Sequence, residues 1–248
     1  MRKLRVGAQL IIWRERALKE LPRVLDEVAS IGYEGVEAGM RILSHYPNYK
    51  ELFESRGLVL SGLHQGIQNE KKVKDALEML KVMDAHYLII SGGRADSKSG
   101  YLKIARTLED IGKLAKEYDV KVCYHNHYWE IENDGLGIKT IIENTDPELV
   151  YLCMDTYWVK YGGMDPVSFM EENLDRIVYL HLKDGTEEDF KRRSFCELGY
   201  GIIDFKSIIN LAKKGNVEWI VVEQDFTKRE PRESMRISRE YLKREFGL

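Results

Sequence analysis

The sequence predicts an α/β protein in which eight parallel strands close into one barrel. Short apolar segments rich in β-branched and aromatic residues alternate with amphipathic segments of helical period along the whole chain. Polar residues follow the ends of most predicted strands, whereas an open sheet would gather them at one switch point. The chain has 248 residues, a common length for one such barrel. We therefore expect a single domain over residues 1–248.

Eight segments have the length and composition of buried strands. A strand parallel to its neighbour needs a helical crossover, and eight such units close a barrel. An open doubly wound sheet is the competing arrangement, but no GxGxxG motif follows the first strand. The predicted strands are Leu4–Trp13, Tyr33–Gly39, Leu58–Gly66, Tyr87–Gly92, Val120–His127, Val150–Trp158, Ile177–Asp184 and Trp219–Asp225.

The segments between the strands carry apolar residues at helical spacing. Gly32 and Gly57 stand where helices commonly end, and Asp165 followed by Pro166 is typical of a helix start. The predicted helices are Ala17–Ile31, Tyr49–Arg56, Lys71–Asp84, Tyr101–Tyr118, Ile138–Asn144, Pro166–Leu174, Phe205–Lys214 and Pro231–Phe246.

Composition narrows the class of protein. Hydrophobic residues make up 44% and charged residues 32%, which is typical of a soluble globular domain. The net charge of -3 argues against a nucleic-acid partner, and no apolar run approaches the roughly 20 residues that span a membrane. Basic residues precede an apolar stretch in 1–13, but no cleavage site follows, so we expect a strand there. The three cysteines, Cys123, Cys153 and Cys196, form no CxxC motif and favour packing roles in a reducing, cytoplasmic location.

Alternation along the later strands separates an aliphatic face from a polar face. In 177–184, for example, Leu180 and Leu182 lie on one face, and His181 and Lys183 lie on the other. The other three strands of the second half alternate in the same way. If the polar face lies inside the barrel, its groups meet at the carboxyl-terminal mouth, where barrel active sites lie. The converging groups are His125 or His127, Asp155, His181 and Glu223.

Two imidazoles and two carboxylates around one point predict a divalent-metal site. Their mixed nitrogen and oxygen donors suit manganese, zinc, cobalt or iron better than calcium, and magnesium stays a candidate. A cation would also offset the cost of burying two carboxylates. Each residue alone has a simpler explanation. A histidine at a strand end is usually a hydrogen-bonded structural residue, Asp155 could cap the next turn, and Glu223 could pair with Lys183.

Further residues near the predicted mouth leave two explanations open. Glu37 and His64 either line the pocket or are structural. Trp158, with Tyr128 and Trp129, either forms an apolar wall for a sugar ring or belongs to the core.

The loop over 185–201 is strongly charged. Its cations Lys191, Arg192 and Arg193 either hold a phosphate or are solvated, and solvation is the expected state of a charge run.

Five stretches together resemble the xylose-isomerase-like TIM-barrel superfamily. They are YHNHYWE, CMDTYWVKYGGMDP, VYLHLKDG, ELGYGIIDF and WIVVEQD. That superfamily includes sugar phosphate isomerase/epimerases, ketose 3-epimerases, inosose dehydratases and the endonuclease IV group. The resemblance covers nearly the whole chain and implies a single (β/α)8 TIM barrel, xylose-isomerase-like, acting on a small sugar or cyclitol.

The resemblance also implies a ligand set. The family holds a divalent cation with Glu, Asp, His and Glu from strands five to eight. Asp155, His181 and Glu223 match the last three. The first position departs from the family, because His125 stands there, with His127 as the alternative.

A second departure is Trp158, where endonuclease IV and the ketose epimerases carry histidine. A three-metal nuclease site and a DNA-repair role are therefore not expected. No nucleic-acid or membrane partner is expected, and homo-oligomerisation stays open because relatives often pair.

The family chemistry would run through an enediolate. A chelated cation stabilises this intermediate, Glu223 is the expected base and Glu130 the second candidate. Lys183 would neutralise charge, and His127 would shuttle a proton. The expected function is a divalent-metal-dependent isomerase or epimerase of a sugar, sugar phosphate or cyclitol. A dehydratase or lyase on a keto-sugar or inosose is the close alternative, and a non-catalytic sugar-binding barrel is a further one.

Overall fold

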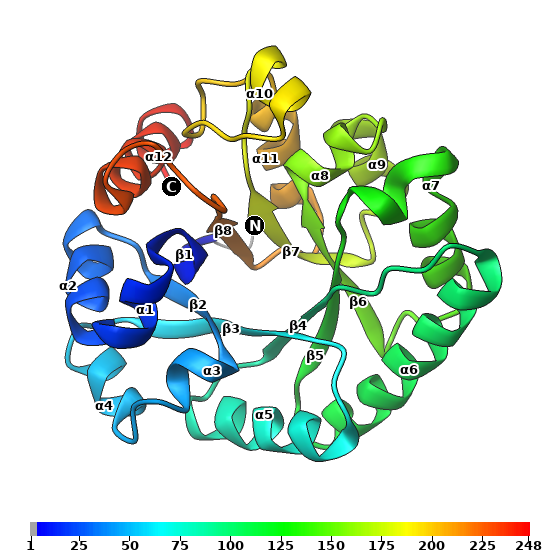
Figure 1. The fold of residues 1–248 in the computed structure, drawn as a ribbon, viewed down its shortest axis with the longest axis horizontal. Helices are drawn as coiled ribbons and strands as arrows, with labels where there is room; N and C mark the ends of the chain where they lie inside the picture. The colour runs from blue at the N-terminus through cyan, green and yellow to red at the C-terminus, as the bar shows by residue number, and fades with distance from the viewer. Residues whose placement is uncertain (1–3) are drawn as a thin grey trace.

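The computed structural model describes residues 4–248, and within them eight parallel strands form a closed barrel in chain order (Figure 1). Strand β1 pairs with both β2 and β8, and this closes the sheet. The predicted (β/α)8 barrel is confirmed. The strands are β1 Arg5–Gln9, β2 Gly35–Gly39, β3 Val59–Gly66, β4 Tyr87–Ser91, β5 Lys121–His125, β6 Val150–Asp155, β7 Ile177–Leu182 and β8 Trp219–Val222.

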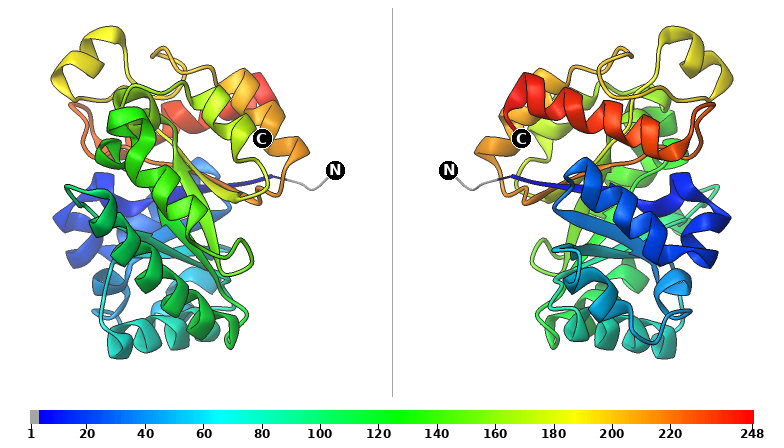
Figure 2. Two further views of the ribbon diagram at one scale, coloured as in Figure 1. Left: turned by 90° about the vertical axis from the view of Figure 1, so that its right-hand side faces the viewer. Right: turned by 90° about the vertical axis from the view of Figure 1, so that its left-hand side faces the viewer.

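Helices surround the barrel, and η1, α1 and α10 lie at the end where the strands terminate (Figures 1 and 2). None of the helices within 4–248 is both long enough and apolar enough to span a membrane. The helices are η1 Leu10–Trp13, α1 Glu15–Lys19, α2 Leu21–Ile31, α3 Met40–Leu43, α4 Tyr49–Glu54, α5 Glu70–Val82, α6 Lys98–Lys116, α7 Tyr128–Glu143, α8 Thr156–Tyr161, α9 Pro166–Glu172, α10 Glu187–Arg192, α11 Phe205–Lys214 and α12 Pro231–Phe246.

The first predicted strand was too long, and the first predicted helix is two helices, α1 and α2. The strand ends at Gln9, because its side chain accepts a hydrogen bond from the Ile11 amide and starts the 3-10 turn η1. The helix expected over 17–31 is broken at Glu20, two residues before Pro22, whose ring does not fit a helix interior.

The strands of the second half also end earlier than predicted. β5, β6, β7 and β8 stop at His125, Asp155, Leu182 and Val222. Helix α7 begins at Tyr128, before the predicted start, and has a non-helical break over 132–135. The polar ends of these segments therefore lie in turns and helix starts, which hold their side chains at the mouth.

A small core fills the barrel below the mouth. Cys123, Cys153, Tyr179 and Val221 are among its members, and all four are fully buried. Both cysteines are free thiols, which agrees with their expected packing role. A second and larger core lies between the strands and the helices. The interior side chains thus form a closed floor beneath the site.

Candidate metal centre and active site

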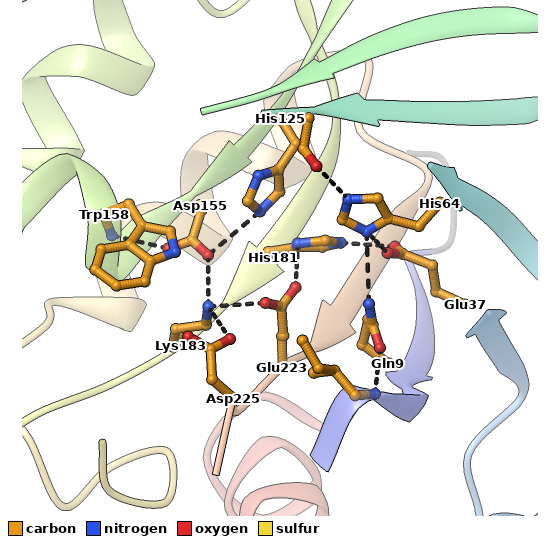
Figure 3. A network of polar contacts seen from close by, with 12 residues as sticks. Gln9, Glu37, His64, His125, Asp155, Trp158, His181, Lys183, Glu223 and Asp225 are labelled. Atoms are coloured by element: carbon orange, nitrogen blue, oxygen red, sulfur yellow. Dashed lines mark hydrogen bonds and ion pairs between the residues drawn. The ribbon is translucent and has the colours of Figure 1, made fainter. Parts of the chain in front are cut away.

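Four predicted ligands meet at the carboxyl ends of β5 to β8 (Figure 3). His125, Asp155, His181 and Glu223 each offer one ligand atom, and these atoms all lie within 4.8 Å of one another. The four residues are between 0% and 5% exposed. We call this group the four-residue cluster.

The cluster fits a divalent cation. The atoms His125 Nε2, Asp155 Oδ2, His181 Nδ1 and Glu223 Oε2 are buried without a hydrogen-bond partner among the described residues. His181 Nδ1 lies 2.5 Å from Glu223 Oε2, but the two are not aligned as a hydrogen bond. An unsatisfied buried polar atom costs about 1–3 kcal/mol, so four together need a common partner. A cation that accepts nitrogen and oxygen donors is such a partner.

Asp155 serves two elements with its two oxygens. Its Oδ1 accepts a 2.8 Å hydrogen bond from the Trp158 amide and caps α8. Its Oδ2 faces the cluster, 3.5 Å from His125 Nε2. The Asp155 amide donates to Asn126 Oδ1 at 3.0 Å, which holds the end of β6 against that of β5. Asp155 therefore caps α8 and also belongs to the cluster, whereas the sequence indicated these roles as alternatives.

Lys183 is fully buried among three carboxylates. Its Nζ lies 2.8 Å from Glu223 Oε1, 3.0 Å from Asp225 Oδ1 and 3.2 Å from Asp155 Oδ2. Burial opposes its charge, but these carboxylates raise the pKa of Lys183 well above the usual value. The pairing of Glu223 with Lys183 is therefore real, and it leaves Glu223 Oε2 free for the cluster.

Glu37 lies behind His181 and is completely buried. Its Oε2 accepts from His181 Nε2 at 2.6 Å, and its Oε1 accepts from His64 Nδ1 at 2.8 Å. Burial opposes ionisation, but the two imidazoles lower the pKa of Glu37 to about 2. A carboxylate at Nε2 assigns the proton of His181 to that nitrogen and leaves Nδ1 free to ligate. His64 continues the chain to Ser91 Oγ at 2.8 Å.

These contacts differ from the expected contact of Glu37 with substrate. Both of its oxygens are occupied by imidazoles, so its contacts are those of a positioning residue. His64 is partly exposed and lines a cavity of about 470 Å³ together with Gln65 and Met40, and its contact with a substrate stays a prediction.

Glu130, the second candidate base from the sequence, is not a member of the cluster. Its Oε1 accepts from the Tyr124 hydroxyl at 2.6 Å, and its Oε2 accepts from the His127 amide at 2.8 Å. The side chain is fully buried, and burial raises the pKa of Glu130 to about 7. Its contacts are those of a residue that anchors the first turn of α7, so it is badly placed to touch a substrate.

The His127 ring lies beside the cluster, 4.9 Å from the His125 ring, and its centroid is 6.0 Å from that of Trp158. His127 stacks on Trp129 with ring centroids 4.2 Å apart, and burial with neighbouring positive groups lowers the pKa of His127 to about 2. A neutral His127 can accept a proton only weakly. The Trp158 ring lies 5.0 Å from Lys183 Nζ.

A second cavity, of about 410 Å³, opens beside Trp158 and Asp225. We call it the aromatic cavity. Its lining residues are Ile11, Arg14, Tyr128, Trp129, Trp158, Arg193, Phe195, Asp225 and Phe226. Tyr128, Trp129 and Trp158 line this cavity, while Trp158 is also largely buried, so the sugar-wall explanation stays a prediction.

Sequence reasoning gave no role to Asn126, Ser91 or Asp225. Asp225 shares the inward face with Glu223, so side-chain parity was the signal that could have found it. Asn126 and Ser91 had no signal of their own, because their roles depend on contacts between neighbouring strand ends.

Comparisons with known proteins cover almost the entire chain. The family model described as xylose isomerase-like TIM barrel matches residues 25–245. The inosose dehydratase of Clostridium tetani is 27% identical, over 99% of this chain and 98% of that protein.

Solved structures share the fold. A sugar phosphate isomerase/epimerase of Parabacteroides distasonis matches with a TM-score of 0.84 at 21% identity, over 99% of this chain and 96% of that one. The IOLI protein, solved with a bound zinc atom, matches with a TM-score of 0.74 at 16% identity, over 97% of each chain. Since the family model covers most of the sequence and the barrel agrees with it, this chain belongs to the xylose isomerase-like TIM barrel family.

Proposed function

We propose that this protein is a divalent-metal-dependent enzyme that removes the proton α to a ketone in a sugar or cyclitol. The four-residue cluster carries the proposal, because its inward ligand atoms accept and donate no hydrogen bond among the described residues. His125, Asp155, His181 and Glu223 Oε2 would hold the cation, which when bound polarises the substrate carbonyl as a Lewis acid. The family's sugar-modifying relatives agree with this chemistry.

Glu223 is the proposed base through Oε1, which accepts from Lys183 Nζ at 2.8 Å and would exchange that contact for the substrate proton, since Oε2 would hold the cation. Burial opposes its ionisation, but Lys183 and His181 hold the pKa of Glu223 well below the usual value, so it is a carboxylate at neutral pH. Lys183 keeps its charge and offsets the negative charge of Asp155, Glu223 and Asp225. Asp225 is the partly exposed member of this group and lines the aromatic cavity, so it is the carboxylate best placed to meet a substrate hydroxyl.

The arrangement favours elimination of water over epimerisation. Epimerisation through two bases needs a carboxylate on each face of the substrate, but His125 replaces one, and Glu130 faces Tyr124 and the His127 amide. Glu223 and Asp225 both contact Lys183 Nζ. A proton taken from the α-carbon can therefore be returned on the same side to the β-hydroxyl, which leaves as water. The proposed reaction is that of a carbon-oxygen lyase, as in the dehydratase relatives.

Isomerisation is the second candidate, for one specific reason. A single carboxylate can also return the proton to the neighbouring carbon on the same face, as a one-base isomerase does. Cytoplasmic location and self-association stay expectations from the sequence.

Proton exchange in deuterium oxide tests the proposal. We expect Mn²⁺-loaded protein to exchange the α-proton of a keto-cyclitol such as 2-keto-myo-inositol, and new enol or diketone NMR signals to follow. Glu223→Gln should lower both the exchange and the product signals by at least about 100-fold, since it removes the positioned base together with one ligand of the cation. Exchange accompanied by the signals of an isomeric sugar, without enol or diketone signals, would select isomerisation. Metal-independent binding without exchange, across keto-sugars and inososes, would instead identify a sugar-binding barrel.

A further inference from the structure

Two arginines of the aromatic cavity have unusual backbone conformations. Arg14 has φ +53° with ψ -131°, and Arg193 has φ +51° with ψ +51°. Positive φ is disfavoured for side chains other than glycine and is concentrated at turns and functional sites. Both residues line the same cavity, although they lie far apart in the sequence. Their backbones hold both side chains at the barrel mouth.

The two guanidinium groups have no carboxylate partner within residues 4–248. Arg193 contacts the Tyr128 hydroxyl at 3.4 Å and lies over that ring at 5.8 Å. The neighbouring Arg192 differs, because it lies 2.7 Å from Glu188 Oε1 and points into solvent. Within the charged loop, the solvated explanation therefore fits Arg192 but leaves Arg193 available for a ligand.

The remaining cavity wall suits the ring of a carbohydrate. Tyr128, Trp129 and Trp158 offer aromatic surface, and the cavity reaches Asp225 beside Lys183. Aromatic faces cover apolar ring surface while leaving polar edges free. Since the carboxylates near Lys183 would repel an anion, an anionic substituent would lie toward the arginines, away from the four-residue cluster.

We infer that the aromatic cavity takes a sugar or cyclitol bearing an anionic group, a phosphate or a carboxylate, which Arg14 and Arg193 bind. This inference rests on the proposed function for the reacting end of the substrate and adds the substrate class. Guanidinium groups match the planar geometry of carboxylates and the oxygen pairs of phosphates. Both arginines are specificity-determining residues in this scheme.

Three probes that share one ring test the inference: D-glucose, D-glucose 6-phosphate and D-glucuronate. Calorimetry measures each Kd for the full chain, once with Mn²⁺ and once with a chelator. We expect at least one anionic probe to bind about tenfold or more tightly than D-glucose under both conditions, because charge-assisted hydrogen bonds add that much. The phosphate and carboxylate arms identify which anion the cavity prefers.

Substitutions assign the preference to the arginines. Arg14→Gln and Arg193→Gln should each weaken the preferred anionic probe about tenfold and leave D-glucose unchanged, and Arg→Lys should restore part of the loss. Arg192→Gln is the matched control and should change nothing. Arg14→Gly offers a second route, because glycine adopts this backbone freely and should keep the fold while losing the anion preference.

The outcomes separate this inference from the proposed function. Equal affinities for the three probes, no binding of either anionic probe, or full preference in the arginine variants would overturn the inference alone. Anion preference that depends on Arg14 and Arg193, without Mn²⁺ binding or α-proton exchange, would support it and overturn the proposed function.

Discussion

The two halves of the barrel contribute differently to the mouth. Strands β5 to β8 supply all four members of the cluster and also lead into Lys183 and Asp225. Strands β1 to β4 supply Gln9, Glu37, His64 and Ser91, which are linked to one another by hydrogen bonds. Glu37 connects this group to the cluster through His181 (Figure 3).

The metal ligands and the residues that position them therefore come from different halves of the chain. The second half offers ligand atoms that form no hydrogen bond within residues 4–248 and that a cation would satisfy. The first half offers a hydrogen-bonded chain that fixes one ligand, His181, in one tautomer. Each of the following substitutions removes a group from one half and measures whether that division holds.

The largest effect should follow Asp155→Asn in the second half. Asparagine keeps an oxygen to cap α8 but loses the charge that faces the cluster. We expect Mn²⁺ binding to fall by more than about 100-fold, beyond the loss typical of a residue behind a ligand, and turnover to disappear. Metal content of the purified protein and calorimetry measure this.

Asp165→Asn is the control for Asp155→Asn. Asp165 caps α9 through a 2.9 Å hydrogen bond from the Ser168 amide and is not a member of the cluster. Its variant should bind Mn²⁺ normally. Equal metal binding in both variants would mean that Asp155 is a helix cap and nothing more.

Lys183→Met should have the next largest effect, on stability. The variant leaves Asp155, Glu223 and Asp225 without their shared cation, and breaking a buried ion pair costs about 3–5 kcal/mol. We expect urea denaturation in chelator to show this loss. Added Mn²⁺ should recover more stability in the variant than in the wild type, because the carboxylates then depend on the metal alone. A variant as stable as the wild type would remove Lys183 from the scheme.

Glu37→Gln tests the first half and should weaken Mn²⁺ binding by about 10- to 100-fold. Glutamine can still accept a hydrogen bond from His181 Nε2 but no longer supplies the negative charge behind the imidazole. Ser91→Ala is two hydrogen bonds further from His181 and should weaken binding less. If Glu37→Gln bound Mn²⁺ like the wild type, the hydrogen-bonded residues of the first half would have no role in metal binding.

The sequence predicted the fold well, because strand and helix periodicity is written locally. Phe205–Lys214 and Pro231–Phe246 have the predicted bounds. Strand ends were missed where one side chain decides the outcome, as Gln9 does by capping η1. Such a cap is a single hydrogen bond, which no periodic pattern reveals.

The sequence predicted those parts of the site that depend on the alternation of side chains along each strand. Side-chain alternation predicted that His125 or His127 would converge with Asp155, His181 and Glu223, and the cluster contains His125 with these three. It did not reveal the contacts of Glu130, because they depend on how α7 starts after β5. The roles of Glu37 and Ser91 were equally hidden, since they arise from contacts between strands that are distant in sequence.

Glu130→Gln should have the smallest effect, and it shows that not every polar group of the second half belongs to the chemistry. The folded state holds the Glu130 proton more tightly than the unfolded chain, since burial raises the pKa of Glu130 to about 7. Its contribution to stability is therefore fully present at low pH and is lost as pH rises from about 4.5 to about 7. Above that window the free energy of unfolding of the wild type is lower by at most about 3 kcal/mol, and the glutamine variant does not show this loss.

Denaturation by urea in chelator, from about pH 5 to about pH 8, measures this difference. Subtracting the two curves cancels the other titrating groups, because both proteins share them. Glu132→Gln, an exposed neighbour on α7, is the control and should follow the wild type. If the free energies of unfolding of wild type and Glu130→Gln changed with pH in parallel, Glu130 would have the same pKa in the folded and unfolded states. A large loss of α-proton exchange in Glu130→Gln, with stability retained, would instead assign this carboxylate to the active site. The distinction between metal ligands and positioning residues would then not separate the catalytic groups.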